Sequence, residues 1–128
     1  MRYTEDEIYK LECRVRVYIV DILGIELYGH VFITKYAGKR NRYYIEIQTL
    51  DIHKTHDQII KKLEDGLGVK GFKLCIEKKD GKYREYYKCN LIRDDLCNID
   101  GMFKMMGFDE YGHNIHYGKL AEKQKGQV

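Results

Sequence analysis

The sequence predicts a single α+β domain in the order helix, strand, strand, helix, strand, strand, helix, with a four-stranded antiparallel sheet that has helices on one face. Two observations indicate this order. Apolar residues recur at steps of three and four in three segments and at steps of two in three others, and turn-forming residues separate the two strands of each pair. The 128 residues are enough for one core. We expect the domain to span 1–117, followed by a disordered polar tail over 118–128.

Capping signals define the three helices. Thr4 with Glu7 has the spacing of a capping box, in which each side chain satisfies a backbone N–H of the first turn. This box begins a helix over about 4–23, whose apolar stripe is Ile8, Leu11, Val15, Tyr18 and Ile22. Thr55 with Gln58 begins a second helix that is ended by Gly66 and Gly68. Asp94 is the expected cap of a third helix, with one apolar side formed by Leu96, Ile99, Phe103 and Met106.

Two hairpins lie between these helices. The first combines residues 25–34 with 42–48 through a turn at 38–41. The second is centred on Asp80-Gly81, the strongest short hairpin signal, and returns over about 83–92. Strand alternation predicts a core face made of Leu27, Val31, Ile33, Ile45, Ile47, Leu74 and Ile76.

The opposite side chains of these strands define a second face, which we call the open face because no helix is predicted to cover it. Its residues are mainly aromatic, cationic or amide-bearing: Tyr28, His30, Phe32, Tyr36, Arg42, Tyr44, Gln48, Lys73, Arg84, Tyr86, Lys88 and Asn90. Cations can neutralise phosphates, amides can bind base edges, and tyrosine rings can stack on bases. The alternative is a solvated face with cross-strand tyrosine and charge pairs.

Composition narrows the function classes. The net charge is only +3, from 23 basic and 20 acidic residues, so a nonspecific nucleic-acid coat is excluded and any basic surface must come from segregation of charge. One such concentration is the first hairpin tip, where four cations occur within eight residues: Lys35, Lys39, Arg40 and Arg42. The longest apolar run, 15–23, contains Arg16 and Asp21 and is no membrane span.

Neither a metal centre nor a catalytic site is predicted. The four cysteines form no C-x-x-C pair, and we expect free thiols in a reducing cytoplasm: Cys13, Cys75, Cys89 and Cys97. Two histidine pairs have metal-like spacing, His53 with His56 and His113 with His116. Both lack the further ligands that structural zinc sites use, so we assign no metal and no cofactor.

Two segments support a comparison with a known family. Residues Tyr18–Ile33 read YIVDILGIELYGHVFI, and Asp57–Val69 read DQIIKKLEDGLGV. Together with the order of elements, these segments resemble LAGLIDADG homing endonucleases over about 15–108. The resemblance implies a sheet that forms a saddle over the DNA major groove, and a first helix that packs at a pseudo-two-fold interface. It also implies a metal-binding acid just before a glycine. Here Tyr28 precedes Gly29 and the nearest acid is Glu26, so the resemblance implies a relative that does not cut.

From the sequence we therefore expect a non-enzymatic, cytoplasmic protein, monomeric or homodimeric, that contacts nucleic acid through the open face. The expected contacts are Tyr28, His30, Lys39, Arg40, Arg42, Tyr44, Gln48, Lys73, Arg84, Tyr86 and Lys88. A second hypothesis is a small inhibitor, encoded by a phage or mobile element, that binds a host defence nuclease in the manner of an anti-CRISPR protein. A third is an active LAGLIDADG-type, metal-dependent DNA endonuclease.

Overall fold

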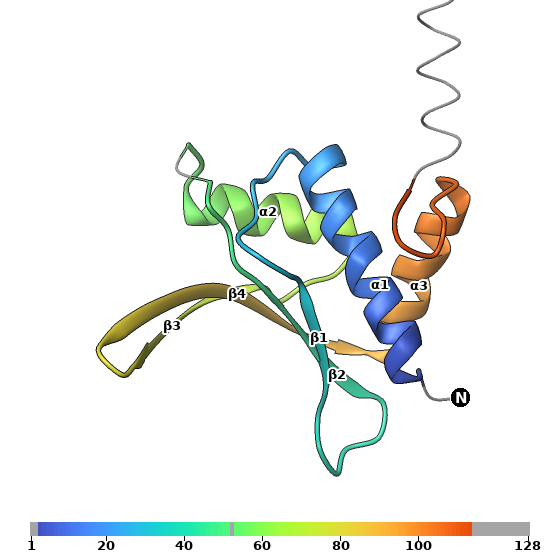
Figure 1. Ribbon diagram of the computed structural model, residues 1–128, viewed down its shortest axis with the longest axis horizontal. Helices are drawn as coiled ribbons and strands as arrows, with labels where there is room; N and C mark the ends of the chain where they lie inside the picture. Colours follow the sequence, from blue (N-terminus) through green and yellow to red (C-terminus); the bar gives the residue numbers. More distant parts are fainter. Residues whose placement is uncertain (1–2, 52, 114–128) are drawn as a thin grey trace, which may run out of the picture.

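Three α-helices lie on one face of a twisted, four-stranded antiparallel sheet in the computed structural model, which describes residues 3–51 and 53–113 (Figure 1). The elements in chain order are α1 (Glu5–Val17), η1 (Tyr18–Ile22), β1 (Phe32–Lys35), β2 (Arg42–Ile47), α2 (His56–Leu67), β3 (Lys73–Lys79), β4 (Lys82–Ile92) and α3 (Arg93–Met105). This order and the single antiparallel sheet confirm the predicted fold class. The predicted tail over 118–128 lies outside the described residues.

Both predicted capping boxes are formed. The Glu7 N–H donates to the Thr4 hydroxyl at 3.1 Å, and the Thr4 N–H donates to the Glu7 carboxylate at 3.0 Å. Thr55 and Gln58 make the same reciprocal pair at the start of α2. These contacts satisfy N–H groups that have no partner within the helix, and they involve only residues three apart in the chain. Local sequence was therefore sufficient to predict where these two helices begin.

The prediction that Asp94 caps the third helix is wrong. Strand β4 runs directly into α3, and the Ile92 N–H donates to the carboxylate of Asp95 at 2.9 Å. Asp95 occupies the third helical position, from which a side chain can reach back to the N-cap backbone. Asp94 is exposed on the first turn. Because the strand passes directly into the helix, the N-cap is Ile92, two residues earlier than the sequence suggested.

The first helix is not one α-helix over 4–23. It changes at Tyr18 into the π-helical turn η1, where the Leu23 N–H donates to the Tyr18 carbonyl at 3.0 Å. The wider turn shifts the helix face, so Ile22, predicted in the apolar stripe, is exposed. Tyr18 remains buried, and its hydroxyl donates to the carbonyl of Gly66 on α2 at 2.7 Å. The turn therefore lies where the first helix meets the second.

The strands are arranged in the order β1-β2-β4-β3, which makes β1 and β3 the two edges. Ile33 pairs with Ile45, which pairs with Cys89, and all three side chains are buried beneath the helices. Strand β1 is shorter than predicted, because residues 25–31 contact the opposite strand region only through a bridge from Leu27 to Thr49. Short edge strands are a common protection against unwanted pairing.

One predicted core residue is misplaced. Val31, Ile33, Ile45 and Ile47 are buried, and Leu27 and Leu74 are half-buried, but Ile76 is 60% exposed. Ile76 lies on the expected side of the strand, the same side as Leu74. The hairpin of β3 and β4, however, continues beyond the described helices (Figure 1), and Ile76 is left exposed on it.

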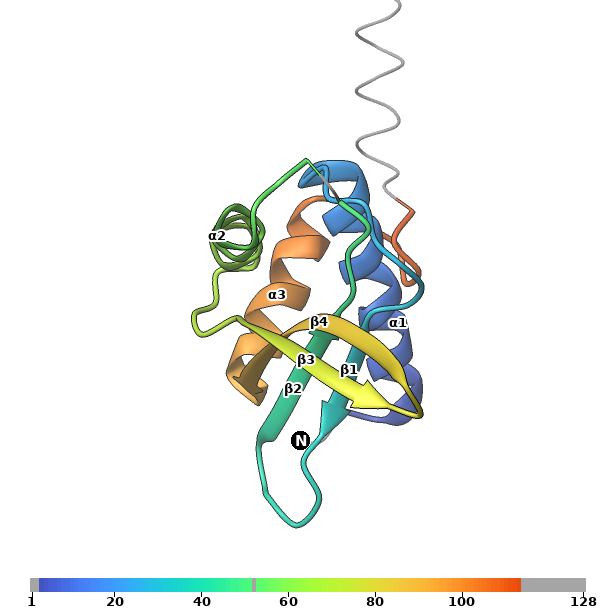
Figure 2. The same ribbon diagram turned by 90° about the vertical axis from the view of Figure 1, so that its left-hand side faces the viewer.

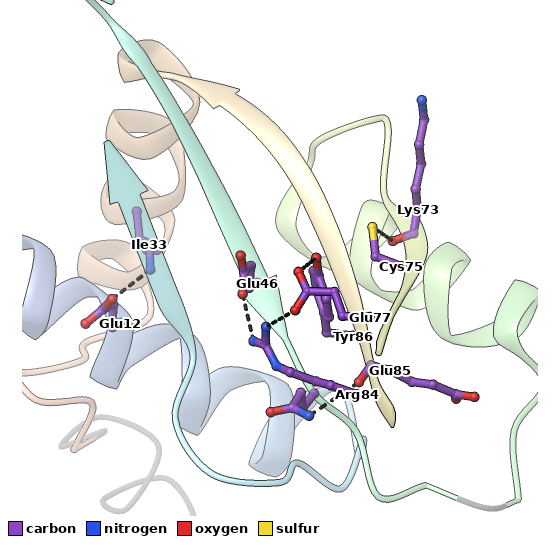
Figure 3. Close-up of polar contacts among 10 residues, drawn as sticks. Glu12, Ile33, Glu46, Lys73, Cys75, Glu77, Arg84, Glu85 and Tyr86 are labelled. Carbon is purple, nitrogen blue, oxygen red and sulfur yellow. Dashed lines mark hydrogen bonds and ion pairs between the residues drawn. The ribbon is translucent and has the colours of Figure 1, made fainter. Parts of the chain in front are cut away.

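A buried carboxylate closes one edge of the sheet. Glu12, on α1, accepts the outward-facing N–H of Ile33 in β1 at 2.7 Å (Figure 3). Its other oxygen lies 2.9 Å from Nε2 of His30. Glu12 is the one charged residue that is buried among the described residues, and these two partners satisfy it. Edge strand β1 is thus tied to the helical layer.

The four cysteines are free thiols in very different environments, and this difference predicts their reactivity. Cys89 is buried, and burial raises the pKa of its thiol to about 11. Cys97 is exposed on α3. We expect iodoacetamide at mildly alkaline pH to alkylate Cys97 in the native protein and Cys89 only after unfolding, because the thiolate is the nucleophile. Peptide mass spectrometry with and without denaturant measures both rates, and rapid native labelling of Cys89 would contradict the described packing.

Candidate functional site on the open face

The strand register gathers the predicted side chains on one surface. A row across all four strands consists of Phe32, Glu46, Lys88 and Lys73. Tyr44 lies beside Asn90 in the next row, and on the other side Tyr86 lies beside Cys75 and Arg84 beside Glu77. Figure 2, which turns the view of Figure 1 by 90°, shows the sheet in front of α1 and α3. The open face is thus left without a helical cover by the described residues.

The centre of the open face is an ion cluster that satisfies itself. The Arg84 guanidinium lies 2.7 Å from the Glu46 carboxylate and 3.4 Å from that of Glu77 (Figure 3). The Tyr86 hydroxyl donates to Glu77 at 2.7 Å, and the Arg84 guanidinium lies 4.3 Å from the centroid of the Tyr86 ring. The hydrogen bond to Glu77 raises the pKa of Tyr86, and Tyr86 and Arg84 together lower the pKa of Glu77.

Two expected contact residues are therefore engaged within the protein. Tyr86 is only 6% exposed because Arg84 lies over its ring, so that ring offers no face for a base. The charge of Arg84 is offset by Glu46 and Glu77, which approach it from strands β2 and β3. The sequence argument did not include these two acids in the face. Only the pairing of β4 with both neighbours brings the three charges together.

A second cluster lies toward the hairpin of β1 and β2. The rings of Tyr36 and Tyr44 are 4.9 Å apart, and the Lys88 ammonium lies 4.3 Å from the centroid of Tyr44 and 5.7 Å from that of Tyr36. The Tyr36 hydroxyl donates to the side-chain carbonyl of Asn90 at 2.7 Å. Lys88 forms no ion pair within the described residues, so its charge is available to an anion. On the ring face of Tyr44 that Lys88 covers, a base could stack only by displacing Lys88.

Cations also occupy both hairpin tips. Lys39, Arg40 and Arg42 belong to the hairpin of β1 and β2, and all three are exposed. The hairpin of β3 and β4 adds three exposed cations that the sequence analysis did not single out: Lys78, Lys79 and Lys82. None of these six forms an ion pair in the part of the chain that the structure describes. The two hairpins project in different directions from the helical layer (Figure 1).

An aromatic strip crosses the β1 edge. The rings of Tyr9 and His30 stack with centroids 5.7 Å apart, and His30 meets Phe32 edge-on at 5.3 Å. Tyr9 and Phe32 are both about half exposed. Tyr9 lies on the solvent side of α1 and did not belong to any pattern in the sequence. Tyr9 joins the strip because its ring stacks on His30, and Glu12 contacts His30 at the edge of the sheet.

The remaining expected contacts lie at the margin of this surface. Tyr28 is exposed before β1 begins, and its N–H donates to the Gln48 carbonyl at 2.9 Å. The Gln48 amide lies just past β2 and donates weakly to the Glu85 carbonyl, at 3.5 Å. Gln48 therefore lies at the end of β2 and contacts the backbone of β4. Tyr28 presents its ring to solvent outside the paired part of the sheet.

The histidines and acids outside the open face do not form a metal centre within residues 3–51 and 53–113, where no three His, Cys, Asp or Glu side chains converge. Nδ1 of His56 lies 2.6 Å from the Tyr87 hydroxyl, and that of His113 lies 2.9 Å from the Asp109 carboxylate. His116 is outside the described residues. Glu26 is exposed, and its backbone carbonyl accepts the Leu50 N–H at 2.9 Å.

The fold and this surface define a small α+β protein with one open, tyrosine- and cation-bearing sheet face. No family model, no curated protein and no solved structure matches the chain. Among the described residues, no helix has the length and apolar character needed to cross a membrane.

Proposed function

We propose that this protein binds duplex nucleic acid without catalysis, through phosphate contacts on the open face and its two hairpins. The observation that carries the proposal is a separation of charge. The acids of the open face are gathered around Arg84 at its centre, whereas Arg42, Lys73 and Lys88 have no carboxylate partner among the described residues. Unpaired cations on an open surface are what a phosphate backbone requires.

The geometry favours backbone contacts over base stacking. Tyr86 is buried beneath Arg84, and Lys88 lies over one face of the Tyr44 ring, so both rings are already engaged by cations of the same chain. Lys73 and Lys88 are paired across β3 and β4, which places two positive charges side by side on the face. Cationic tips on two divergent hairpins extend this surface. A distant relation to LAGLIDADG domains would fit the same mode of binding, and it is supported by the order of elements.

Lys88→Gln tests the proposal directly. In gel-shift titrations at several salt concentrations, the wild-type protein should bind duplex DNA or RNA with an affinity that falls steeply with salt. Lys88→Gln should weaken binding and make the salt slope shallower by about one unit, because one phosphate contact is lost. Lys61→Gln is the matched control, since Lys61 lies on α2 and is paired with Asp65. Absence of binding at low salt would refute the proposal.

A protein partner is the second candidate, and the aromatic strip favours it. Tyr9, His30 and Phe32 give an exposed apolar patch next to the open face, and aromatic residues are enriched where proteins bind one another. A small inhibitor of a host defence nuclease would use such a patch. In a pull-down from the source cell, capture of one protein that persists after nuclease treatment and is lost in Phe32→Ala would support this candidate over nucleic acid.

A further inference from the structure

The two edges of the sheet differ. Strand β1 is tied to α1 through Glu12, whereas the outer edge of β3 has no other strand beside it among residues 3–51 and 53–113. The hairpin of β3 and β4 extends away from the helices, so its outer edge is accessible along most of its length (Figure 1). Such an edge presents backbone N–H and C=O groups to any strand that can align with it.

The turn identifies which backbone groups point outward. Asp80 and Gly81 both have positive φ, 53° and 76°, as in a two-residue type I′ turn. The closing bond of this turn joins the carbonyl of Lys79 to the N–H of Lys82, so the backbone groups of Lys79 face β4. Antiparallel pairing then alternates, and the outer edge presents every second residue: Leu74, Ile76 and Lys78.

The next outward group along this edge already has a partner. The Phe72 N–H donates to the Glu64 carboxylate at 3.1 Å, and Glu64 also accepts the N–H of Gly71. No described residue plays this part for Leu74, Ile76 or Lys78. Three consecutive outward positions of β3 are therefore available to an added strand.

The sequence of β3 is complementary to itself in one antiparallel register. If Cys75 lies opposite Cys75 of a second copy, Lys73 lies opposite Glu77 and Leu74 lies opposite Ile76. A register centred one residue later, on Ile76, would instead place Lys73 opposite Lys79, and like charges directly opposite are destabilising. Charge therefore favours the register centred on Cys75 over the register centred on Ile76.

Two features of the single chain fit this register. The central cluster holds two carboxylates, Glu46 and Glu77, against one guanidinium, so a further cation would neutralise it. Ile76 is exposed although it lies on the core side of the strand. In the pairing centred on Cys75, Leu74 of the second copy would cover it. The same pairing would neutralise the excess carboxylate charge around Arg84 and cover the exposed side chain of Ile76.

We propose that β3 is a dimerisation edge, on which a second copy of this chain pairs antiparallel about a two-fold axis at Cys75. The backbone groups of Leu74 and Ile76 would contribute about four hydrogen bonds between the copies. The product is one continuous sheet of both chains. This inference concerns the sheet edge and goes beyond the proposed function of the open face, and its test requires no nucleic acid.

Charge reversal tests the pairing. In sedimentation equilibrium, the wild-type chain should dimerise, and Lys73→Glu or Glu77→Lys should each raise the dimer dissociation constant by about tenfold or more, since two attractive pairs become repulsive. An equimolar mixture of the two variants should regain the dimer, because each reversed charge then meets its opposite. A monomeric wild type, or a dimer that survives both reversals, would overturn the proposal.

Cross-linking tests the register. A Cys13→Ser/Cys97→Ser variant retains Cys75 and the buried Cys89. Treatment with diamide should join the two Cys75 thiols of a dimer, with diamide accepting their two electrons and two protons. The covalent dimer should disappear under dithiothreitol and should not form when Cys75→Ser is added. A dimer in solution that gives no such cross-link would overturn the register centred on Cys75.

Discussion

Phe103→Ala should lower the free energy of unfolding by about 3–5 kcal/mol. Phe103 is fully buried on α3, with ring centroids 5.3 Å from Tyr18 and 5.2 Å from Phe108. The substitution removes the ring that joins the first helix region to the chain segment after α3, and the surrounding rings cannot collapse fully into the space. Urea denaturation followed by circular dichroism measures the change.

Met105→Ala provides the control from the same helix. Met105 is 90% exposed, so its truncation should change the free energy of unfolding by no more than about 0.5 kcal/mol. Both substitutions introduce alanine, the residue with the highest helix propensity, so a loss of helix propensity does not explain a difference between them. Equal effects at Phe103 and Met105 would contradict the described core.

Removing three cations from the open face and its first hairpin should nearly abolish nucleic-acid binding at moderate salt. In the proposed mode, the triple variant Arg40→Gln/Arg42→Gln/Lys88→Gln loses three phosphate contacts, and Lys73 is kept because it is also proposed to face Glu77 of a second copy. We expect an affinity loss on the order of a hundredfold and a salt slope shallower by about three units. Gel-shift titrations over a series of salt concentrations measure both. Stability should change little, because none of the three forms an ion pair with a described residue.

The matched control removes the same net charge from the helical side. Lys10→Gln/Lys61→Gln/Lys104→Gln lowers the positive charge by three, but each of these lysines is paired with a carboxylate on or beside the helices. If binding depends on the open face, this triple variant should retain most of its affinity. An equal loss in both triple variants would indicate that only total charge matters.

The parts of the fold that depend on neighbouring residues were predictable from sequence. Capping boxes at Thr4 and Thr55 involve residues three apart, and strand alternation placed Ile33 and Ile45 on the core side. Where the prediction failed, the burial of the residue depends on an element that is distant in the sequence. Ile76 obeys the alternation but lies beyond the helices, and no local pattern states how far a helical layer extends.

The candidate site was predicted less completely, for a related reason. Alternation placed Arg84 and Tyr86 on the open face, but their environment depends on Glu46 and Glu77, which belong to two other strands. Only the register between strands reveals that these four side chains form one cluster. The π-helical turn at Tyr18 was also not predictable, because it accompanies a contact with Gly66, which lies far along the chain.

The carboxylate of Glu12 has a consequence for aggregation. An incoming strand would need the N–H of Ile33, which Glu12 already occupies from within the same molecule, so growth of the sheet at β1 is obstructed. A subunit with two open edges can polymerise without limit, whereas a subunit with one open edge can only form a closed pair. If two copies pair through β3 as proposed, this single acidic side chain on a helix would limit that assembly to a closed pair.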